Sequence, residues 1–128
     1  MNDSDLGKFI FRITIAVLML FHGYAKLKYG LGFIEGVLQA KGLPTFISYF
    51  VYVGEILAPI LLIIGYKTRF AATSIIITMF CAIYLVFPND LMTLSKVGAL
   101  KLELNYFFIF TSLALIFTGA GKYSFDRR

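Results

Sequence analysis

The chain has 128 residues, of which 59% are hydrophobic and 17% aromatic, and its mean hydropathy is +0.84. A soluble domain of this length has too small an interior to bury so much apolar surface, so the composition predicts a single integral membrane domain over residues 1–128. The net charge of +5 does not indicate a nucleic-acid partner, because the charged residues, 15% of the chain, cluster between apolar blocks as they do at the ends of membrane spans.

The first apolar block, residues 9–27, carries a polar stripe. At about 100° per residue, Arg12, His22 and Lys26 fall within roughly 80° of one another around the helix axis. His22 is the only histidine in the chain. Lys8 and Arg12 resemble the basic end of a signal peptide, but the residues after the block are bulky and basic, so we expect the block to be retained as a membrane span.

A short amphipathic segment and a second apolar block follow. Residues 31–43 are too few to cross a bilayer and predict a helix lying at the membrane interface. The second block, residues 46–65, places Glu55 near mid-depth, with no cation on its own helix within a turn. Its partner must therefore come from another helix, or the carboxyl must be protonated. Gly23 and Gly54 would let the two backbones approach closely near these groups.

The third and fourth apolar blocks are residues 70–87 and 103–120, each near the roughly 20 residues that a bilayer requires. The tight connection at 66–69 predicts that the second and third helices form an antiparallel hairpin. The whole pattern predicts an all-α, four-helix transmembrane bundle with both termini on one side. Basic residues favour a cytoplasmic position for that side: it holds Lys8, Arg12, Lys67, Arg69, Lys122, Arg127 and Arg128, against Lys26, Lys28, Lys41, Lys96 and Lys101 on the other.

Side chains near the outer half of the bundle complete the candidate site. Tyrosines gather there, which indicates either an aromatic belt at the membrane interface or a polar, aromatic pocket open to the outside. Because the first two helices run antiparallel, Glu55 comes to about the depth of His22, and Glu55 and His22 are the candidate catalytic residues. The candidate ligand-binding residues are Lys26, Arg12, Tyr24, Tyr52, Glu103 and Tyr106. A structural reading stays open, in which Lys26 and Arg12 extend to the membrane surface and Glu55 forms a plain salt bridge.

Several kinds of chemistry are excluded within one chain. Cys81 stands alone in the third block, so no dithiol can form, and we expect it to be a small buried thiol. His22 has no second histidine with which to hold a haem, and no metal-ligand spacing or phosphate loop appears. The remaining polar groups can bind a quinone headgroup, with Glu55 or His22 passing protons. No cofactor is expected within the chain itself, so electrons would come from a partner protein or a soluble thiol.

The order of these features resembles a known family. Arg12 in the first helix is followed by "HGYAKL", by "GLP" before the second helix, by Glu55, by "LLIIGYKTRFAA" at the hairpin and by "GAGKYSFD" at residues 119–126. This pattern is similar to the DoxX family of small four-helix bacterial membrane proteins, from about residue 12 to residue 126. The resemblance implies a bundle in the bacterial cytoplasmic (inner) membrane. It also implies an oxidoreductase subunit, because relatives include the membrane part of thiosulfate:quinone oxidoreductase and partners of superoxide dismutase and sulfurtransferase in oxidative-stress defence.

Two functions therefore compete. In the first, the chain is the quinone-binding membrane subunit of an oxidoreductase that works with a redox partner protein. In the second, it is a non-catalytic membrane partner that docks or stabilises other proteins, and the polar stripe only locks the bundle. A small transporter for protons or a lipid-like ligand is a third possibility. The lipid bilayer is a partner in every case, and a homo-oligomer remains open.

Overall fold

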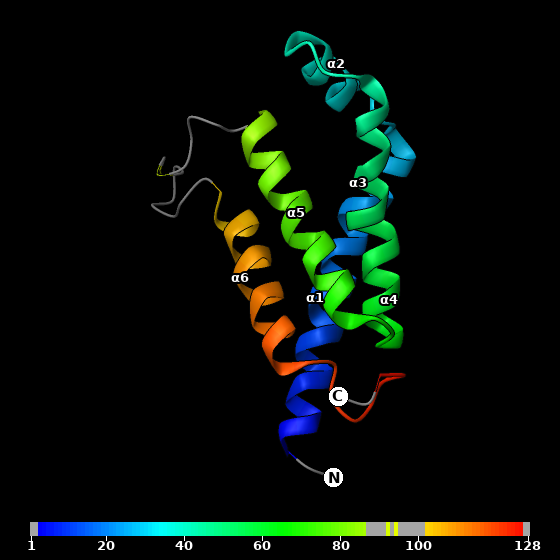
Figure 1. Ribbon diagram of the computed structural model, residues 1–128, viewed down its shortest axis with the longest axis vertical. Helices are drawn as coiled ribbons and strands as arrows, with labels where there is room; N and C mark the ends of the chain where they lie inside the picture. Colours follow the sequence, from blue (N-terminus) through cyan, green and yellow to red (C-terminus); the bar gives the residue numbers. More distant parts are fainter. Residues whose placement is uncertain (1–2, 87–91, 93, 95–101, 127–128) are drawn as a thin grey trace.

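The computed structural model describes residues 3–86, 92, 94 and 102–126, and the elements in this part of the chain are helices (Figure 1). In chain order they are α1 (Asp3–Tyr29), α2 (Gly32–Ala40), the 3-10 helix η1 (Thr45–Tyr49), α3 (Phe50–Tyr52), the π-helix η2 (Val53–Leu57), α4 (Ala58–Ile64), α5 (Thr68–Val86) and α6 (Glu103–Thr118).

Three helical stretches of the described residues are long and apolar enough to cross a membrane: Asp3–Tyr29, Thr45–Ile64 and Thr68–Leu85. The membrane character predicted from composition is thereby supported. The fourth predicted span corresponds to α6, which has 16 residues and is shorter than the roughly 20 that a bilayer core requires. A fourth crossing therefore stays a prediction.

The first span is longer than its apolar block. It begins at Asp3 and has 27 residues, because a polar first turn continues the helix beyond the membrane-compatible part. Asp3 and Asp5 lie in the first turn, and Lys26 and Lys28 lie in the last. Each pair has the charge that stabilises its end of the helix dipole.

The segment predicted to lie at the interface contains a helix of nine residues, α2, at the end of the bundle away from both termini (Figure 1). Leu38 of this helix is buried, whereas Phe33 is exposed. The helix therefore has a packed side and an open side. Its position at the membrane surface stays a prediction.

The second predicted span is helical throughout but changes its winding three times, from η1 through α3 and η2 to α4. It ends at Gly65, whose positive φ of 77° closes the helix with a hydrogen bond from its N–H to the Leu61 carbonyl at 2.8 Å. Three residues after Gly65 α5 begins, and the predicted antiparallel hairpin of α4 and α5 is confirmed (Figure 1).

The helices pack around one core. α1 packs against α4 and η2, and α5 packs against α4, η2 and α6. Small residues on α1, α4 and α5 let these helices approach closely. The core consists of Ile15, Ala16, Met19, Ala58, Leu62, Ala71, Ala72, Ile75, Met79, Ile83, Leu102, Phe108, Ile109 and Leu115.

Both chain ends lie at the same end of the bundle, as predicted (Figure 1). The backbone N–H of Lys122 donates a hydrogen bond to Asp5 Oδ1 at 3.3 Å. The chain then folds back onto the α4–α5 turn, where Phe125 N–H donates to the Ile64 carbonyl at 3.1 Å and Asp126 N–H donates to the Gly65 carbonyl at 2.8 Å.

Candidate functional site

An ion pair between α1 and η2 forms the centre of the candidate site. The Lys26 Nζ lies 2.7 Å from Glu55 Oε1 and 2.7 Å from Glu55 Oε2. The Glu55 side chain is 3% exposed and that of Lys26 is 28% exposed. The embedded acid thus has the interhelical cationic partner that its isolation on its own helix required.

The π-helix η2 carries Glu55 and is held by two glycines. A side chain at Gly23 would collide with the Glu55 carbonyl oxygen and with Ile56, and one at Gly54 would collide with Thr78. The predicted close approach of the two backbones is confirmed at Gly23, whereas Gly54 faces the Thr78 side chain of α5 and not the backbone of α1. A π-helix adds a residue to one turn, which re-aims the side chains on either side of it, and such turns occur often at functional sites.

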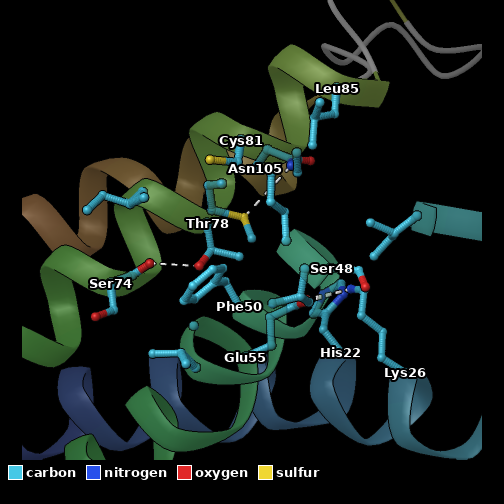
Figure 2. A pocket seen from close by; sticks show the side chains of 18 of the residues that line it. His22, Lys26, Ser48, Phe50, Glu55, Ser74, Thr78, Cys81, Leu85 and Asn105 are labelled. Carbon is cyan, nitrogen blue, oxygen red and sulfur yellow. Dashed lines mark hydrogen bonds and ion pairs between the residues drawn. The ribbon is translucent and has the colours of Figure 1, made fainter. Parts of the chain in front are cut away.

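A cavity of about 560 Å³ lies beside the ion pair (Figure 2). Lys26 and Glu55 line it from one side, and residues of α5 and α6 line it from the other, with α2 and η1 contributing further side chains. Most of its lining is aliphatic or aromatic, including Leu38, Phe50 and Phe108. Small-molecule sites commonly have this size and this mixture of many apolar groups with few polar ones.

His22 lines the same cavity, one helical turn before Lys26. Its ring stands edge-to-face against Phe108, with 5.8 Å between the ring centroids and an interplanar angle of 84°. This contact with a buried aromatic of α6 holds the imidazole in place. His22, Lys26 and Glu55, three of the eight predicted site residues, thus lie at one cavity.

The other five predicted residues lie outside the cavity lining. Tyr24 points outward and is exposed. The Tyr52 hydroxyl donates to the Lys26 carbonyl at 3.5 Å, which places it behind the ion pair. Glu103 begins α6 and is exposed, and Tyr106 packs against the hydrophobic core.

Arg12, the fifth of these residues, belongs to the opposite end of the bundle. It is 0% exposed. Its Nη1 donates to the Leu62 carbonyl at 3.1 Å and its Nη2 to the Tyr123 carbonyl at 2.7 Å. Gly65 leaves room for this guanidinium, because a side chain there would collide with Arg12 Nη1 and with Ser124. Arg12 therefore fastens the C-terminal segment to α4 instead of reaching Glu55.

Several cavity residues were not singled out as ligand-binding from the sequence: Ser48, Ser74, Thr78, Cys81 and Asn105. The Ser74 and Thr78 hydroxyls donate to carbonyls one turn earlier in α5. The Asn105 amide nitrogen lies 3.8 Å from the Met79 sulfur, a weak acceptor. Ser74, Thr78 and Cys81 recur at i, i+4 and i+7, the spacing of one helix face, and this spacing was the signal in the sequence that could have identified them.

The interpretation of Cys81 as a buried thiol is wrong. Cys81 is exposed and lines the cavity. The pattern around it is apolar on all sides of α5, and burial cannot be assigned to one face of such a helix in a membrane protein, because lipid accepts apolar side chains as readily as a protein core does.

The polar side chains at the cavity favour recognition of an organic molecule over binding of a metal ion. No group of three or more His, Cys, Asp or Glu side chains with metal-binding geometry occurs in residues 3–86 and 102–126. The ammonium of Lys26, the carboxylate of Glu55 and the imidazole of His22 can donate and accept hydrogen bonds at one side of an apolar cavity. Such an arrangement suits a flat molecule with polar atoms at its edge.

Fold and site together define a small helical membrane protein with an ion pair in the wall of a ligand-sized cavity. The chain matches the DoxX family model over residues 7–88, more than half of its length, and it belongs to the DoxX family. It is also 26% identical to the protein described as "Putative oxidoreductase CatD" from Bacillus subtilis (strain 168), over 130 residues covering 98% of this chain and 90% of the relative. No solved structure matches the chain.

Proposed function

We propose that this protein is the quinone-binding membrane subunit of an oxidoreductase and receives electrons from a partner redox protein. The observation that carries the proposal is the Lys26–Glu55 ion pair, because it puts a paired charge in the wall of a cavity whose other lining is mainly apolar. An ionisable pair within membrane-spanning segments is costly and by default indicates function.

The cavity residues fit a quinone headgroup. Phe50, Phe108 and Leu38 provide flat and aliphatic surfaces for a ring, and the volume of about 560 Å³ is in the range of small-molecule sites. Lys26 and His22 can donate hydrogen bonds to a carbonyl oxygen at the ring edge. When bound, a quinone would supply the redox chemistry by taking up two electrons and two protons to become a quinol.

The residues around the ion pair have distinct roles in this proposal. The Lys26 ammonium donates to the nearer carbonyl oxygen and stabilises the negative charge that develops there. Glu55 holds that ammonium at the cavity and can pass a proton to it, and His22 is placed to deliver a second proton. Because Lys26 is partly exposed, it can regain its proton from water at that end of the bundle.

The similarity to the Bacillus subtilis protein described as an oxidoreductase, at 26% identity, supports an oxidoreductase role. This chain has neither a dithiol nor a second histidine to hold a haem, so a redox partner protein is part of the proposal. We place the protein in the bacterial inner membrane, with four spans including α6, α2 at the outer interface and both termini in the cytoplasm. The basic residues listed above support that orientation.

A second candidate function is that of a non-catalytic membrane partner which docks or stabilises other proteins. It is favoured by the ion pair between Lys26 and Glu55 and by the hydrogen bonds from the two terminal nitrogens of Arg12 to backbone carbonyls, since such contacts can serve packing alone. In that case these polar groups only fix the packing of the helices. Measurement of quinone binding separates the two functions.

The test is a titration of purified protein in lipid vesicles with a short-tailed quinone, together with quantification of quinone extracted from the protein. We expect saturable binding that Lys26→Met weakens about ten- to a hundredfold, the cost of a lost charge-assisted hydrogen bond. Lys28→Met is the matched control, since Lys28 lies in the same last turn and outside the cavity. Absence of binding, or equal binding by both variants, would contradict the proposal and favour the docking role.

A further inference from the structure

We propose that the cavity holds its ligand with a polar ring inward and an apolar tail outward, and that the tail passes between α3 and α5 into the bilayer. This inference rests on the proposed function and names the class of its ligand: a lipid-soluble, tailed amphiphile that enters sideways from the membrane, and not a water-soluble molecule.

The first support is the difference in burial between the two ends of the cavity. Ser48 and the Glu55 side chain are almost fully buried, next to the Lys26 ammonium. At the other end Phe50 is 61% exposed and Ile77 is 57% exposed, and Cys81 is exposed as well. Glu55 is therefore more enclosed than the apolar residues Phe50 and Ile77, and we place the opening for the tail, the mouth of the cavity, between α3, which carries Phe50, and α5, which carries Ile77.

The second support is the depth of this mouth. Ile77 lies nine residues after Thr68, the first residue of α5, which is about 14 Å along the helix axis. The hydrocarbon core of a bilayer is about 30 Å thick, so a mouth at mid-helix opens among lipid tails and not in water. α5 meets the length and composition expected of a membrane span.

The third support is the chemistry of the rim. Phe50 and Ile77 are apolar and exposed, whereas Lys26, Glu55 and His22 bring the polar groups to another part of the lining. A charged or strongly polar solute would lose its hydration in passing such a rim, without a partner to replace it. A hydrocarbon tail gains contacts with the same side chains and leaves only the polar ring to be recognised by the Lys26–Glu55 pair.

Cys81 provides a native reporter of this path, because it is the only cysteine and lies at the cavity wall near the mouth. We would measure its rate of alkylation by a membrane-permeant maleimide in lipid vesicles. Three probes are compared: a ring-tetrasubstituted benzoquinone without a tail, the same ring with a decyl tail, and decylbenzene. Full ring substitution prevents addition of the thiol to the quinone. The control is the double variant Phe80→Cys, Cys81→Ser, because Phe80 is also exposed on α5 but lies outside the cavity.

The decyl quinone at about ten times its Kd should slow alkylation of Cys81 about tenfold, because only about a tenth of the protein then remains free. The tailless quinone and decylbenzene should leave the rate within about a factor of two, and the control variant should respond to none of the probes. Equal protection by the tailless quinone would overturn the tail path. Equal protection by decylbenzene, or protection of the control variant, would show that lipid tails bind this surface non-specifically. Either result would also overturn the tail path.

A second variant distinguishes failure of the tail path from failure of the proposed function. Ile77→Trp narrows the mouth and should weaken binding of the decyl quinone several-fold while leaving the tailless ring unchanged. If neither quinone binds the unmodified protein, the proposed function fails and this inference fails with it. If both bind in a Lys26-dependent manner and Ile77→Trp weakens both equally or neither, only the tail path is wrong.

Discussion

The backbone of Gly23 in α1 lies directly against the carbonyl oxygen of Glu55 in η2, so closely that a methyl group at position 23 has no room. The same contact sets the distance between α1 and the second span at the level of the Lys26–Glu55 pair. The geometry of the ion pair therefore depends on a residue that has no side chain.

Gly23→Ala should destabilise the bundle by about 1–3 kcal/mol, the usual cost of overpacking, because the atom in the way belongs to the backbone of η2 and cannot rotate aside. Thermal unfolding in detergent measures this change. The control is Gly36→Ala in α2, where an added methyl group meets nothing within 4 Å. That substitution should be neutral or stabilising by up to about 1 kcal/mol. A fully stable Gly23→Ala variant would mean that the two helices are free to separate.

Arg12→Met should release the C-terminal segment from the bundle. The change removes two charge-assisted hydrogen bonds from a fully buried guanidinium and leaves the Leu62 and Tyr123 carbonyls without these donors. We expect a loss of about 3 kcal/mol in unfolding free energy and faster trypsin cleavage after Lys122. Mass spectrometry of timed digests follows the cleavage.

Arg69→Met is the control for that experiment, since Arg69 also donates to a carbonyl, that of Ile116 at 2.9 Å, but on the exposed surface. Its loss should cost less than about 1 kcal/mol and leave cleavage unchanged. Equal protease resistance of Arg12→Met and the unmodified protein would show that the guanidinium does not hold the segment.

Asp126→Ala should weaken the start of α5. Asp126 Oδ1 accepts a hydrogen bond from Lys67 N–H at 3.1 Å, and its Oδ2 accepts one from Thr68 N–H at 2.9 Å. The carboxylate thus caps α5 from a distant part of the chain, and its removal should cost about 0.5–2 kcal/mol. Asp126→Asn retains one acceptor oxygen and should lose less. Hydrogen exchange at the first turn of α5 would detect the change, and identical exchange in all three proteins would contradict it.

The topology can be tested with single cysteines in a Cys81→Ser background, labelled by an impermeant reagent in sealed vesicles. Lys67→Cys and Lys122→Cys should react from one side, and Lys41→Cys and Leu94→Cys from the other. This pattern follows if α1, the second span, α5 and α6 all cross. Labelling of Lys122→Cys from the side of Leu94→Cys would exclude a crossing by the 16 residues of α6.

Much of this arrangement was predictable because burying charge in lipid is costly. Glu55 had no cation on its own helix, and the facing stripe on α1 supplied Lys26. Gly23 and Gly54 were recognisable as contact points because lipid-embedded helices pack through small residues. In the first case the cost of an unpaired charge, and in the second the need for close helix packing, restricted how these helices could be arranged.

Other features were not predictable, because their partners carry no sequence signal. Arg12 binds backbone carbonyls, which every residue possesses, so its role depends on where the C-terminal segment folds. The π-helix at Val53–Leu57 has no sequence feature that specifies its winding, which depends on packing against α1 and α5. The position of Cys81 on the cavity wall depends on the rotation of α5, and lipid accepts the largely apolar side chains of this helix on any of its faces.

The Lys26–Glu55 pair leads to the prediction that best separates a structural role from a chemical one. Because the Lys26 side chain is 28% exposed, its ammonium can turn toward water when the carboxylate is removed, so Glu55→Gln should cost only about 1–2 kcal/mol, less than a fully buried broken pair. Quinone-coupled activity with the redox partner should nevertheless be abolished, since glutamine keeps the shape but carries no titratable proton.

Combining Glu55→Gln with Lys26→Met in a double-mutant cycle gives the coupling energy of the pair, expected at about 0.5–3 kcal/mol. Glu35→Gln in α2, outside the cavity, serves as the control for loss of one negative charge. A Glu55→Gln protein that is unstable yet active when folded would assign the pair to packing alone, and one that is both stable and fully active would remove Glu55 from structural and chemical roles alike.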